Sequence, residues 1–115
     1  MPRPNIDNAF FGSIIIDGQK YGSDLIISWD GEIRERERNH NFKKEDFDEI
    51  MMKEPEAIVI GTGNSGLLQV DPALRVSANL NGTELIVAKT PEAIRHFNSL
   101  AKIRKKVIAI LHATC

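Results

Sequence analysis

The chain has 115 residues, 42% of them hydrophobic, and its net charge is -1. This length fits one domain with its own core, and the near-neutral charge excludes an electrostatic reason to expect nucleic acid or an anionic membrane as partner. The one cysteine, Cys115, excludes an internal disulfide framework. No apolar stretch approaches the roughly 18 residues of a membrane span, and the first residues lack the apolar centre of a signal peptide. We expect a single cytoplasmic domain over residues 1–115, with residues 1–8 loosely ordered.

The first third of the sequence predicts β-hairpins. Ile14–Ile16 leads into Asp17-Gly18, a dipeptide that favours a type I′ turn because both central residues of that turn have positive φ. Leu25–Trp29 is a second β-prone run, and Asp30-Gly31 after it predicts a second turn of the same kind.

Charges alternate strictly in the stretch "EIRERER" that follows. On a strand, Arg34, Arg36 and Arg38 share one face, because successive side chains point to opposite sides. This pattern predicts an exposed strand or a sheet edge protected by charge. The three arginines are a candidate surface for a protein partner. The alternative is a solvated face, because neighbouring glutamates cancel most of the positive field.

The second part of the chain alternates helices and strands. Apolar spacing, caps and prolines predict three helices, one over about Phe42–Lys53 capped by Asn41, one from Asp71-Pro72 to about Asn79, and one from Thr90-Pro91 to about Arg104. Short apolar runs predict buried strands at Ala57–Ile60, at Leu85–Ala88 and in the closing "VIAILHATC". Two hairpins followed by β-α-β-α-β predict an α/β domain with a mixed sheet and packed helices.

The stretch "AIVIGTGNSGLL" places glycines 61, 63 and 66 in G-x-G-x-x-G spacing after an apolar run. A dinucleotide site needs a helix that begins at these glycines and an acidic residue at the end of the next strand. Here the next helix starts only at Asp71-Pro72, and that strand ends at Lys89. The stretch also lacks the Gly-Lys ending of a phosphate-binding P-loop and the last glycine of a nucleophile elbow. We therefore expect no cofactor.

Two interpretations of this loop stay open. The glycines can serve a turn with positive φ and close backbone packing. Alternatively, a loop at the carboxyl end of a buried strand is where open α/β sheets bind ligands, and its N–H groups can hold an anion. The candidate ligand-binding residues are Gly61, Thr62, Gly63, Asn64, Ser65, Gly66 and His112. His112 and Cys115 alone are too few to hold a metal, so we predict no metal site.

Five stretches occur together in one order: "FFGSIIIDGQKYGSDLIIS", "DGEIRERERNH", "PEAIVIGTGNSGLLQV", "TPEAIRHFNSL" and "VIAILHATC". In this order they resemble the Mth-type family of small uncharacterised proteins, over about Phe10 to Cys115. That family includes the adipogenesis-associated domain protein of animals and a mitochondrial complex I assembly factor. The resemblance implies a three-layer α/β fold with a mixed central sheet flanked by helices, and no established activity or cofactor.

The resemblance marks particular positions of this chain. Those that match are Phe11, Gly12, Gly18, Tyr21, Asp24, Gly61, Thr62, Gly63, Gly66, Thr90, Ala93, Asn98, Leu100, His112, Thr114 and Cys115. The chain departs from the family at Phe97, where a tyrosine is frequent, and in "RERER", where a tryptophan is frequent.

Two functional hypotheses follow. The first is a non-enzymatic accessory or assembly-type protein that acts through a protein partner, because the resemblance implies no activity and no complete catalytic set is present. The second is a small-molecule or anion-binding protein, open to being an enzyme, with its site at the glycine loop and His112 as acid or base. A homo-oligomer is compatible with both.

Overall fold

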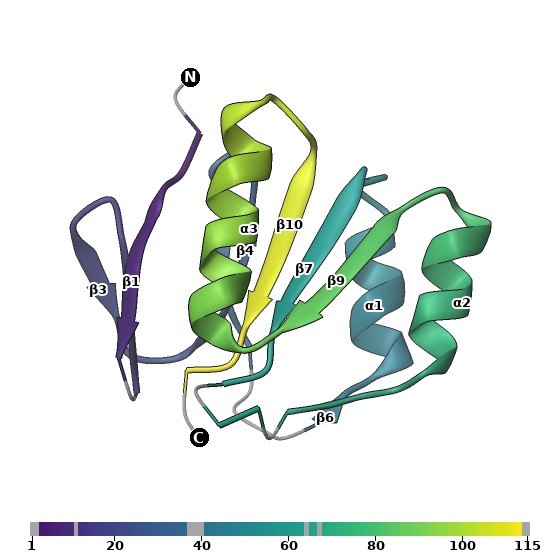
Figure 1. Cartoon of the computed structure of the whole chain (residues 1–115), viewed down its shortest axis with the longest axis horizontal. Coiled ribbons are helices and arrows are strands. Elements are labelled where there is room, and N and C mark those ends of the chain that lie inside the picture. Colours follow the sequence, from purple (N-terminus) through teal and green to yellow (C-terminus); the bar gives the residue numbers. More distant parts are fainter. Residues whose placement is uncertain (1–2, 11, 37–40, 64, 67, 114–115) are drawn as a thin grey trace.

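A five-stranded mixed sheet forms the centre of the fold (Figure 1). The computed structural model describes residues 3–10, 12–36, 41–63, 65–66 and 68–113. In spatial order the strands are β5 (Ile33–Arg36), β4 (Asp24–Ser28), β10 (Val107–Leu111), β7 (Ala57–Gly61) and β9 (Glu84–Ala88). β10 pairs antiparallel with β4 and parallel with β7, so the strand nearest the carboxyl end of the chain lies in the middle of the sheet.

Helices cover both faces of this sheet. α3 (Thr90–Lys102) packs on one face, and α1 (Lys44–Met51) and α2 (Ala73–Leu80) pack on the other. A small antiparallel sheet lies beside α3 and consists of β1 (Ile6–Phe10), β2 (Ser13–Ile16) and β3 (Gln19–Tyr21). The short strands β6 (Asn41–Phe42) and β8 (Gln69–Val70) pair in parallel. The prediction of an α/β domain with a mixed sheet flanked by helices is confirmed.

Alternation along the central strands divides the core in two. Val59 and Ala109 face α3 and join the cluster that contains Phe97. Ile110 faces the opposite way and joins the cluster that contains Phe47 of α1. Every residue of β7 and β10 is buried, as expected for strands covered on both faces.

The two predicted hairpin turns have different geometries. Asp17 and Gly18 have φ values of 47° and 84°, so the type I′ turn is confirmed. In the second hairpin Gly31 has a φ of 97°, whereas Asp30 has no positive φ. The Gly31 amide donates to the carbonyl of Ser28, so Trp29 and Asp30 are the central residues of the turn and Gly31 follows them. The prediction of a second type I′ turn was therefore wrong.

Three further predictions need correction. α1 begins at Lys44 rather than at Phe42, because Phe42 is buried in the core and pairs in β6 beside Val70. Residues 1–8 were expected to be loosely ordered, but Ile6 is buried and begins β1, where Asn98 of α3 binds its amide and its carbonyl. β9 was predicted to be a buried strand, but it lies at the edge of the sheet and Leu85 alone among its residues is buried.

The start of α2 follows the sequence prediction. The carboxylate of Asp71 accepts a hydrogen bond of 2.9 Å from the amide of Ala73, and Pro72 has helical φ and ψ. The aspartate thus caps the helix and the proline occupies the first helical position.

Candidate functional site

The glycine loop and His112 meet at the carboxyl end of β7 and β10. The amide of His112 donates to the carbonyl of Gly61 at 3.0 Å. The buried hydroxyl of Thr90, the first residue of α3, accepts from the amide of Gly63 at 2.9 Å and donates to the carbonyl of His112 at 3.2 Å. Thr90 therefore ties the loop to the residue that follows β10.

A physical reason can be given for the glycine at each of the three loop positions. A Cβ on Gly61 would lie 2.9 Å from Cδ2 of Leu111 and 3.0 Å from Oγ1 of Thr90, closer than real side chains approach. Gly63 and Gly66 have φ values of 98° and 75°, in the left-handed region that favours glycine. The interpretation as a turn with positive φ and close packing is confirmed for these three residues.

The amides of this loop are largely used within the chain. Thr62 donates from its amide and its hydroxyl to the carbonyl of Ala88, Gly63 donates to Thr90, and Gly66 donates to the carbonyl of Gly63. The expected cradle of free N–H groups is therefore not formed by Thr62, Gly63 and Gly66. Ser65 is exposed, and Asn64 lies outside the described residues.

The side chain of His112 belongs to a buried ionic cluster. Its Nδ1 lies 2.7 Å from Oδ2 of Asp24, and both side chains are 0% exposed. The guanidinium of Arg36 donates to the same oxygen at 3.1 Å, and its side chain is 6% exposed. The amide of Ala113 donates to the other oxygen of Asp24 at 2.8 Å. Because an ionised carboxylate only accepts, this arrangement assigns the Nδ1 proton to His112.

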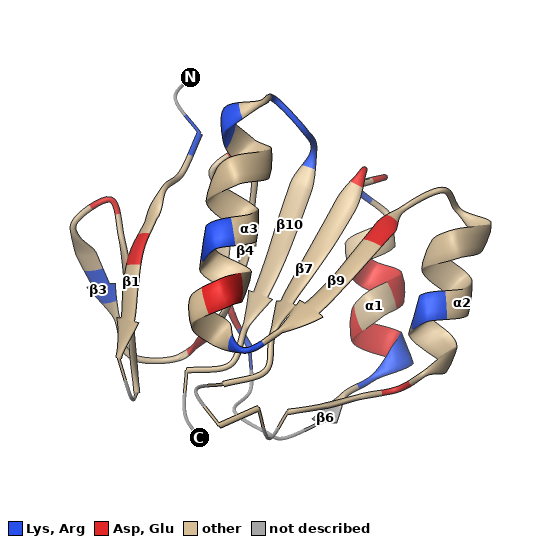
Figure 2. Cartoon of the chain, viewed as in Figure 1, with Lys and Arg blue, Asp and Glu red and all other residues tan. Residues whose placement is uncertain are grey.

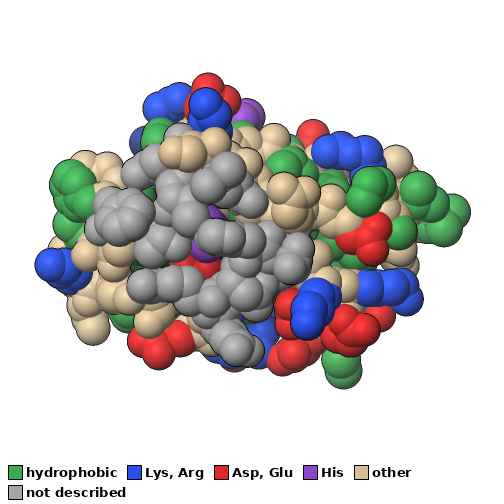
Figure 3. All heavy atoms as spheres, turned by 90° about the horizontal axis from the view of Figure 1, so that it is seen from below, with side chains coloured by type: hydrophobic (Ala, Val, Ile, Leu, Met, Phe, Trp, Pro, Cys, Tyr) green, Lys and Arg blue, Asp and Glu red, His purple; other side chains and the backbone are tan. Residues whose placement is uncertain are grey.

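Strand register explains why these three residues meet. Asp24 pairs with Arg36 across β4 and β5, and Leu25 pairs with Leu111 across β4 and β10. The register therefore places Asp24 opposite His112, one position beyond Leu111. The three side chains form a row across the sheet on its α1 side, beyond the carboxyl end of β10. Figure 3 views the molecule from the end at which the β10 arrow points in Figure 1, and histidine and acidic atoms are visible near its centre.

A carboxylate that fixes the tautomer and orientation of a histidine is the arrangement by which proteins prepare an imidazole as a base or ligand. Burying the charges of Asp24 and Arg36 costs several kcal/mol unless they are paired and hydrogen-bonded, and these two form an ion pair here. Within the described residues, no group of three or more metal-ligating side chains forms. The chemistry available from this cluster is therefore that of an oriented histidine beside a fixed ion pair.

The predicted arginine surface separates into three environments. Arg36 is buried in the cluster and lies over the ring of Phe42 at 5.8 Å. Arg34 is partly exposed and contacts Glu49 of α1 at 2.6 Å and Glu32 at 3.7 Å. Arg38 lies outside the described residues. The structure thus places Arg36 inside the fold, whereas only Arg34 of the two described arginines reaches the surface.

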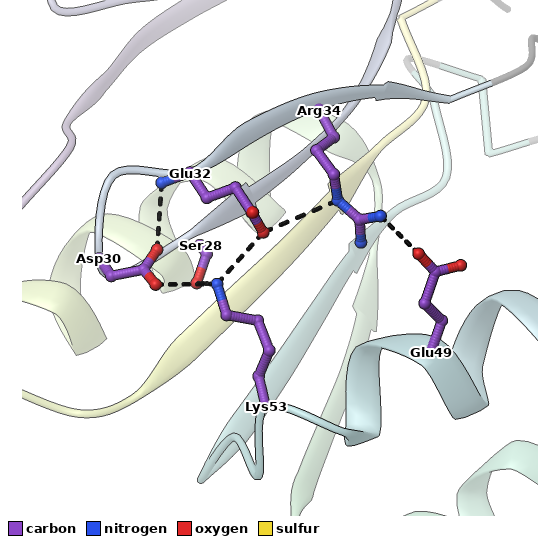
Figure 4. Close-up of polar contacts among 6 residues, drawn as sticks. All are labelled: Ser28, Asp30, Glu32, Arg34, Glu49 and Lys53. Atoms are coloured by element: carbon purple, nitrogen blue, oxygen red, sulfur yellow. Dashed lines mark hydrogen bonds and ion pairs between the residues drawn. The ribbon is translucent and has the colours of Figure 1, made fainter.

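Arg34 extends an ion-pair network between the β4–β5 hairpin and α1 (Figure 4). Nζ of Lys53 donates to Oγ of Ser28 at 3.0 Å, to Oδ2 of Asp30 at 2.9 Å and to Oε1 of Glu32 at 3.2 Å. Lys53 also lies 5.3 Å from the centre of the Trp29 ring. The network fastens the edge hairpin to the helix layer.

Lys53→Met tests the contribution of this network through its pH dependence. The hydrogen bond from Lys53 lowers the pKa of Asp30 below its usual value of 3.8. Because the folded pKa lies below the unfolded one, the stabilisation is complete above about pH 4 and disappears as the pH falls through the folded pKa. We expect the variant to lose less than about 1 kcal/mol at pH 7, since Asp30 is 46% exposed, and less than that at about pH 3, where protonation of Asp30 weakens the contact. Urea unfolding at both pH values measures this, and an equal deficit at both would contradict it.

Sequence reasoning missed Asp24 and Arg36 as members of the site. Asp24 was noted only through the family resemblance, and Arg36 only as a surface residue. A signal was present, because Asp24 opens the apolar strand "DLIIS" and a buried carboxylate requires a partner. The partner, His112, follows the apolar "VIAIL" 88 residues later, and no local pattern connects the two.

Fold and site together define a three-layer α/β protein whose central strand leads into a buried Asp–His–Arg cluster. The chain belongs to a family described as "Protein of unknown function (DUF498/DUF598)", whose profile matches residues 6–112. The resemblance to the Mth-type family is confirmed by this match and by the structures below.

Three solved structures illustrate the likeness. The conserved hypothetical protein PH1505 from Pyrococcus horikoshii OT3 is 26% identical with a TM-score of 0.84, covering 96% of this chain and 99% of its own. The protein MT938 is 27% identical with a TM-score of 0.82, covering 97% and 99%. A protein from Bartonella henselae, described as an outer membrane protein, is 25% identical with a TM-score of 0.82, covering 98% and 97%. In the described part of this chain, no helix is long and apolar enough to cross a membrane.

Proposed function

We propose that this chain is a non-enzymatic accessory protein that binds a protein partner through α2 and the edge strand β9. The observation that carries the proposal is the exposure of large apolar side chains on this side of the fold. Leu80 is 82% exposed and Val76, one turn earlier on α2, is 60% exposed. Side chains of this kind on one face are typical of interaction sites.

The adjoining edge of β9 offers backbone groups to an added strand. The amide of Glu84 donates to the carbonyl of Glu56, and the carbonyl of Ala88 accepts from the amide of Thr62, so the backbone groups of these two residues face the β7 side. Successive residues of a strand direct their backbone groups to opposite sides. Leu85 and Val87 therefore face outward. Arg75 of α2 donates to the carbonyl of Leu85 at 3.3 Å. No hydrogen bond joins the outward groups of Val87 to another described residue.

The α2–β9 surface, residues 73–88, is poor in charge. Its 16 residues include only Arg75 and Glu84 as charged side chains, although 27% of the whole chain is charged. The opposite edge strand, β5, instead carries the charges that discourage pairing. Depletion of charge is the compositional mark of interface cores. The occupant that fits is an extended apolar segment of another protein, which adds to β9 and packs on Val76 and Leu80.

The test begins with capture of partners from the native cell, followed by binding measurements with the purified pair. We expect a stoichiometric partner whose affinity falls at least about tenfold in Leu80→Glu and in Val87→Lys, since each substitution places a charge in an apolar contact. Gln19→Glu, an exposed change on β3, is the matched control and leaves the affinity unchanged. A partner whose affinity ignores both α2–β9 variants, or repeated failure to capture any partner, would refute the proposal. Sedimentation of the purified chain shows whether a second copy occupies the surface instead.

The proposal includes a cytoplasmic location. It is supported by the cysteine content of the sequence, because one cysteine cannot form the internal disulfides that small exported domains commonly carry. The similar protein from Bartonella henselae is instead described as an outer membrane protein. Fractionation of native cells with an antibody against this chain decides between the two locations, and recovery in the membrane fraction would contradict the cytoplasmic assignment.

A second candidate function is binding of a small molecule or anion at the glycine-loop end of the sheet, open to an enzymatic role. The observation in its favour is that Thr90 and the backbone of Gly61 hold His112 beside the loop while Asp24 orients its ring. NMR titration with a metabolite library is the test. Shifts that centre on Ser65, Gly66 and His112 would support it, and shifts elsewhere would exclude it.

A further inference from the structure

Positive charge gathers at the end of α3 and in the loop after it (Figure 2). The basic cluster consists of Arg3, Lys102, Arg104, Lys105 and Lys106. The whole chain has 15 basic and 16 acidic residues, so the remainder carries 10 basic against 16 acidic residues. A molecule with a net charge of -1 therefore concentrates five cations at one end.

A groove of about 470 Å³ lies within this cluster. The N-terminal segment contributes Arg3 and Asn5 to its walls, and α3 with the following turn contributes Asn98, Lys102 and Arg104. None of the described residues that line the groove is acidic. Beside the groove, Glu56 contacts two members of the cluster: its carboxylate accepts from the amide of Lys106 at 2.9 Å and lies 3.8 Å from Nζ of Lys105. A hydrogen bond from the amide of Lys106 and the charges of Lys105, Lys106 and Arg3 lower the pKa of Glu56.

Arg104 occupies a position where glycine is usual. Its φ is 66°, and the amides of Arg104 and Lys105 donate to the carbonyls of Ala101 and Leu100. These two bonds form the Schellman motif, in which the left-handed residue after the helix is most often glycine because a Cβ is strained there. Arg104 therefore occupies a position where glycine would relieve the strain of the left-handed backbone.

The other groove cations have ordinary structural roles. Lys102 lies in the last turn of α3, where a cation is stabilised by the helix dipole. Arg3 donates to the carbonyls of Arg104 and Lys105 and so fastens the N-terminal segment to the turn. No contact within the described residues accounts for the guanidinium of Arg104. Strained residues that persist are typical of functional sites.

We propose that this groove binds a phosphate-bearing small molecule and that Arg104 is retained at the helix end to contact it. Guanidinium groups match the paired oxygens of a phosphate, and an ammonium adds a point charge. The groove volume lies within the range of small-molecule sites. The site is separate from the α2–β9 surface, and it lies at the opposite end of α3 from the glycine loop.

The test is titration of the purified chain with pyrophosphate, followed by amide NMR at near-physiological salt. We expect saturable shifts at Arg3, Lys102 and residues 104–106. In Arg104→Gly we expect affinity to fall about tenfold or more, while the Tm rises by about 2–5 °C because the left-handed strain is released. Loss of binding by a more stable protein cannot result from unfolding. Arg95→Ala removes one exposed charge from α3 outside the groove and is expected to bind like the parent.

Four outcomes would overturn the proposal. Shifts that do not saturate would mean that pyrophosphate only screens the surface charge. Equal affinity in Arg104→Gly and the parent would remove Arg104 from the site. Equal binding of citrate at matched charge would show recognition of any polyanion rather than of phosphate. Shifts confined to Ser65, Gly66 and His112 would favour the glycine-loop site and equally reject the groove.

Discussion

Asp24→Asn is expected to lower the free energy of unfolding by about 3–5 kcal/mol, the usual cost of removing one partner from a buried ion pair. The carboxylate of Asp24 accepts from Arg36, from His112 and from the amide of Ala113, and the carboxylate itself is fully buried. An amide of the same shape offers one oxygen, and its NH₂ group faces a donor. A domain of this size has a total free energy of unfolding of about 5–15 kcal/mol. A loss of the expected size is therefore a large fraction of the total, and equilibrium urea unfolding measures it directly.

Two further variants make the Asp24 result interpretable. Asp48→Asn removes a carboxylate from an exposed pair with Lys44 and is expected to change stability by less than about 0.5 kcal/mol. The double variant Asp24→Leu with Arg36→Met removes both charges together and is expected to be more stable than Asp24→Asn, because no unpaired ion stays buried. A stability for Asp24→Asn equal to that of the parent would show that the cluster is not an energetically coupled unit.

Gly61→Ala is expected to destabilise the chain by about 1–3 kcal/mol through overpacking. The new methyl group would meet Cδ2 of Leu111 at 2.9 Å, and Oγ1 and Cα of Thr90 at 3.0 and 3.2 Å. Neither neighbour can retreat easily, because Leu111 is in the central strand and Thr90 holds Gly63 and His112. The helix start and the histidine should therefore shift together. Thermal unfolding gives the loss, and NMR of the His112 ring reports the displacement.

Gly22→Ala is the matched control for this substitution. A Cβ at Gly22 meets no atom of the described residues within 4 Å, and Gly22 has no positive φ. The same chemical change should therefore be neutral or slightly stabilising there, because alanine restricts the unfolded chain. If both variants lose the same stability, close packing at Gly61 is not the reason for its glycine.

Local signals accounted for most of the fold. Gly18 tolerates the positive φ of its turn, and Pro72 and Pro91 fix φ at the starts of α2 and α3, so this turn and these two helix starts were predictable. β1 and the pairing of Phe42 with Val70 were not, because these segments are held by distant partners such as Asn98. The order of the strands was not predictable either, because tertiary contacts determine which strand pairs with β10 on each side.

The candidate site was predictable in part. The proximity of the glycine loop and His112 was predictable, because both follow apolar strands at their carboxyl ends and the structure brings them together. Alternation correctly placed Arg34 and Arg36 on one face, but it could not show which side of the sheet that face would meet. Arg36 is buried because β4 brings Asp24 beside it, and that pairing depends on the register of two strands.

The central place of β10 has a consequence for the order in which the molecule can be built. During synthesis β4 and β7 emerge long before residues 107–111, and in the finished sheet each of them pairs with β10. Until that segment leaves the ribosome, the β5–β4 hairpin and the β7–β9 pair are separate halves, each with an exposed inner edge. During this interval the nascent chain exposes two apolar strand edges, each of which can pair with a strand of another molecule. Closure of the sheet and the contact of Asp24 with His112 both require residues 107–112, so neither can precede their synthesis.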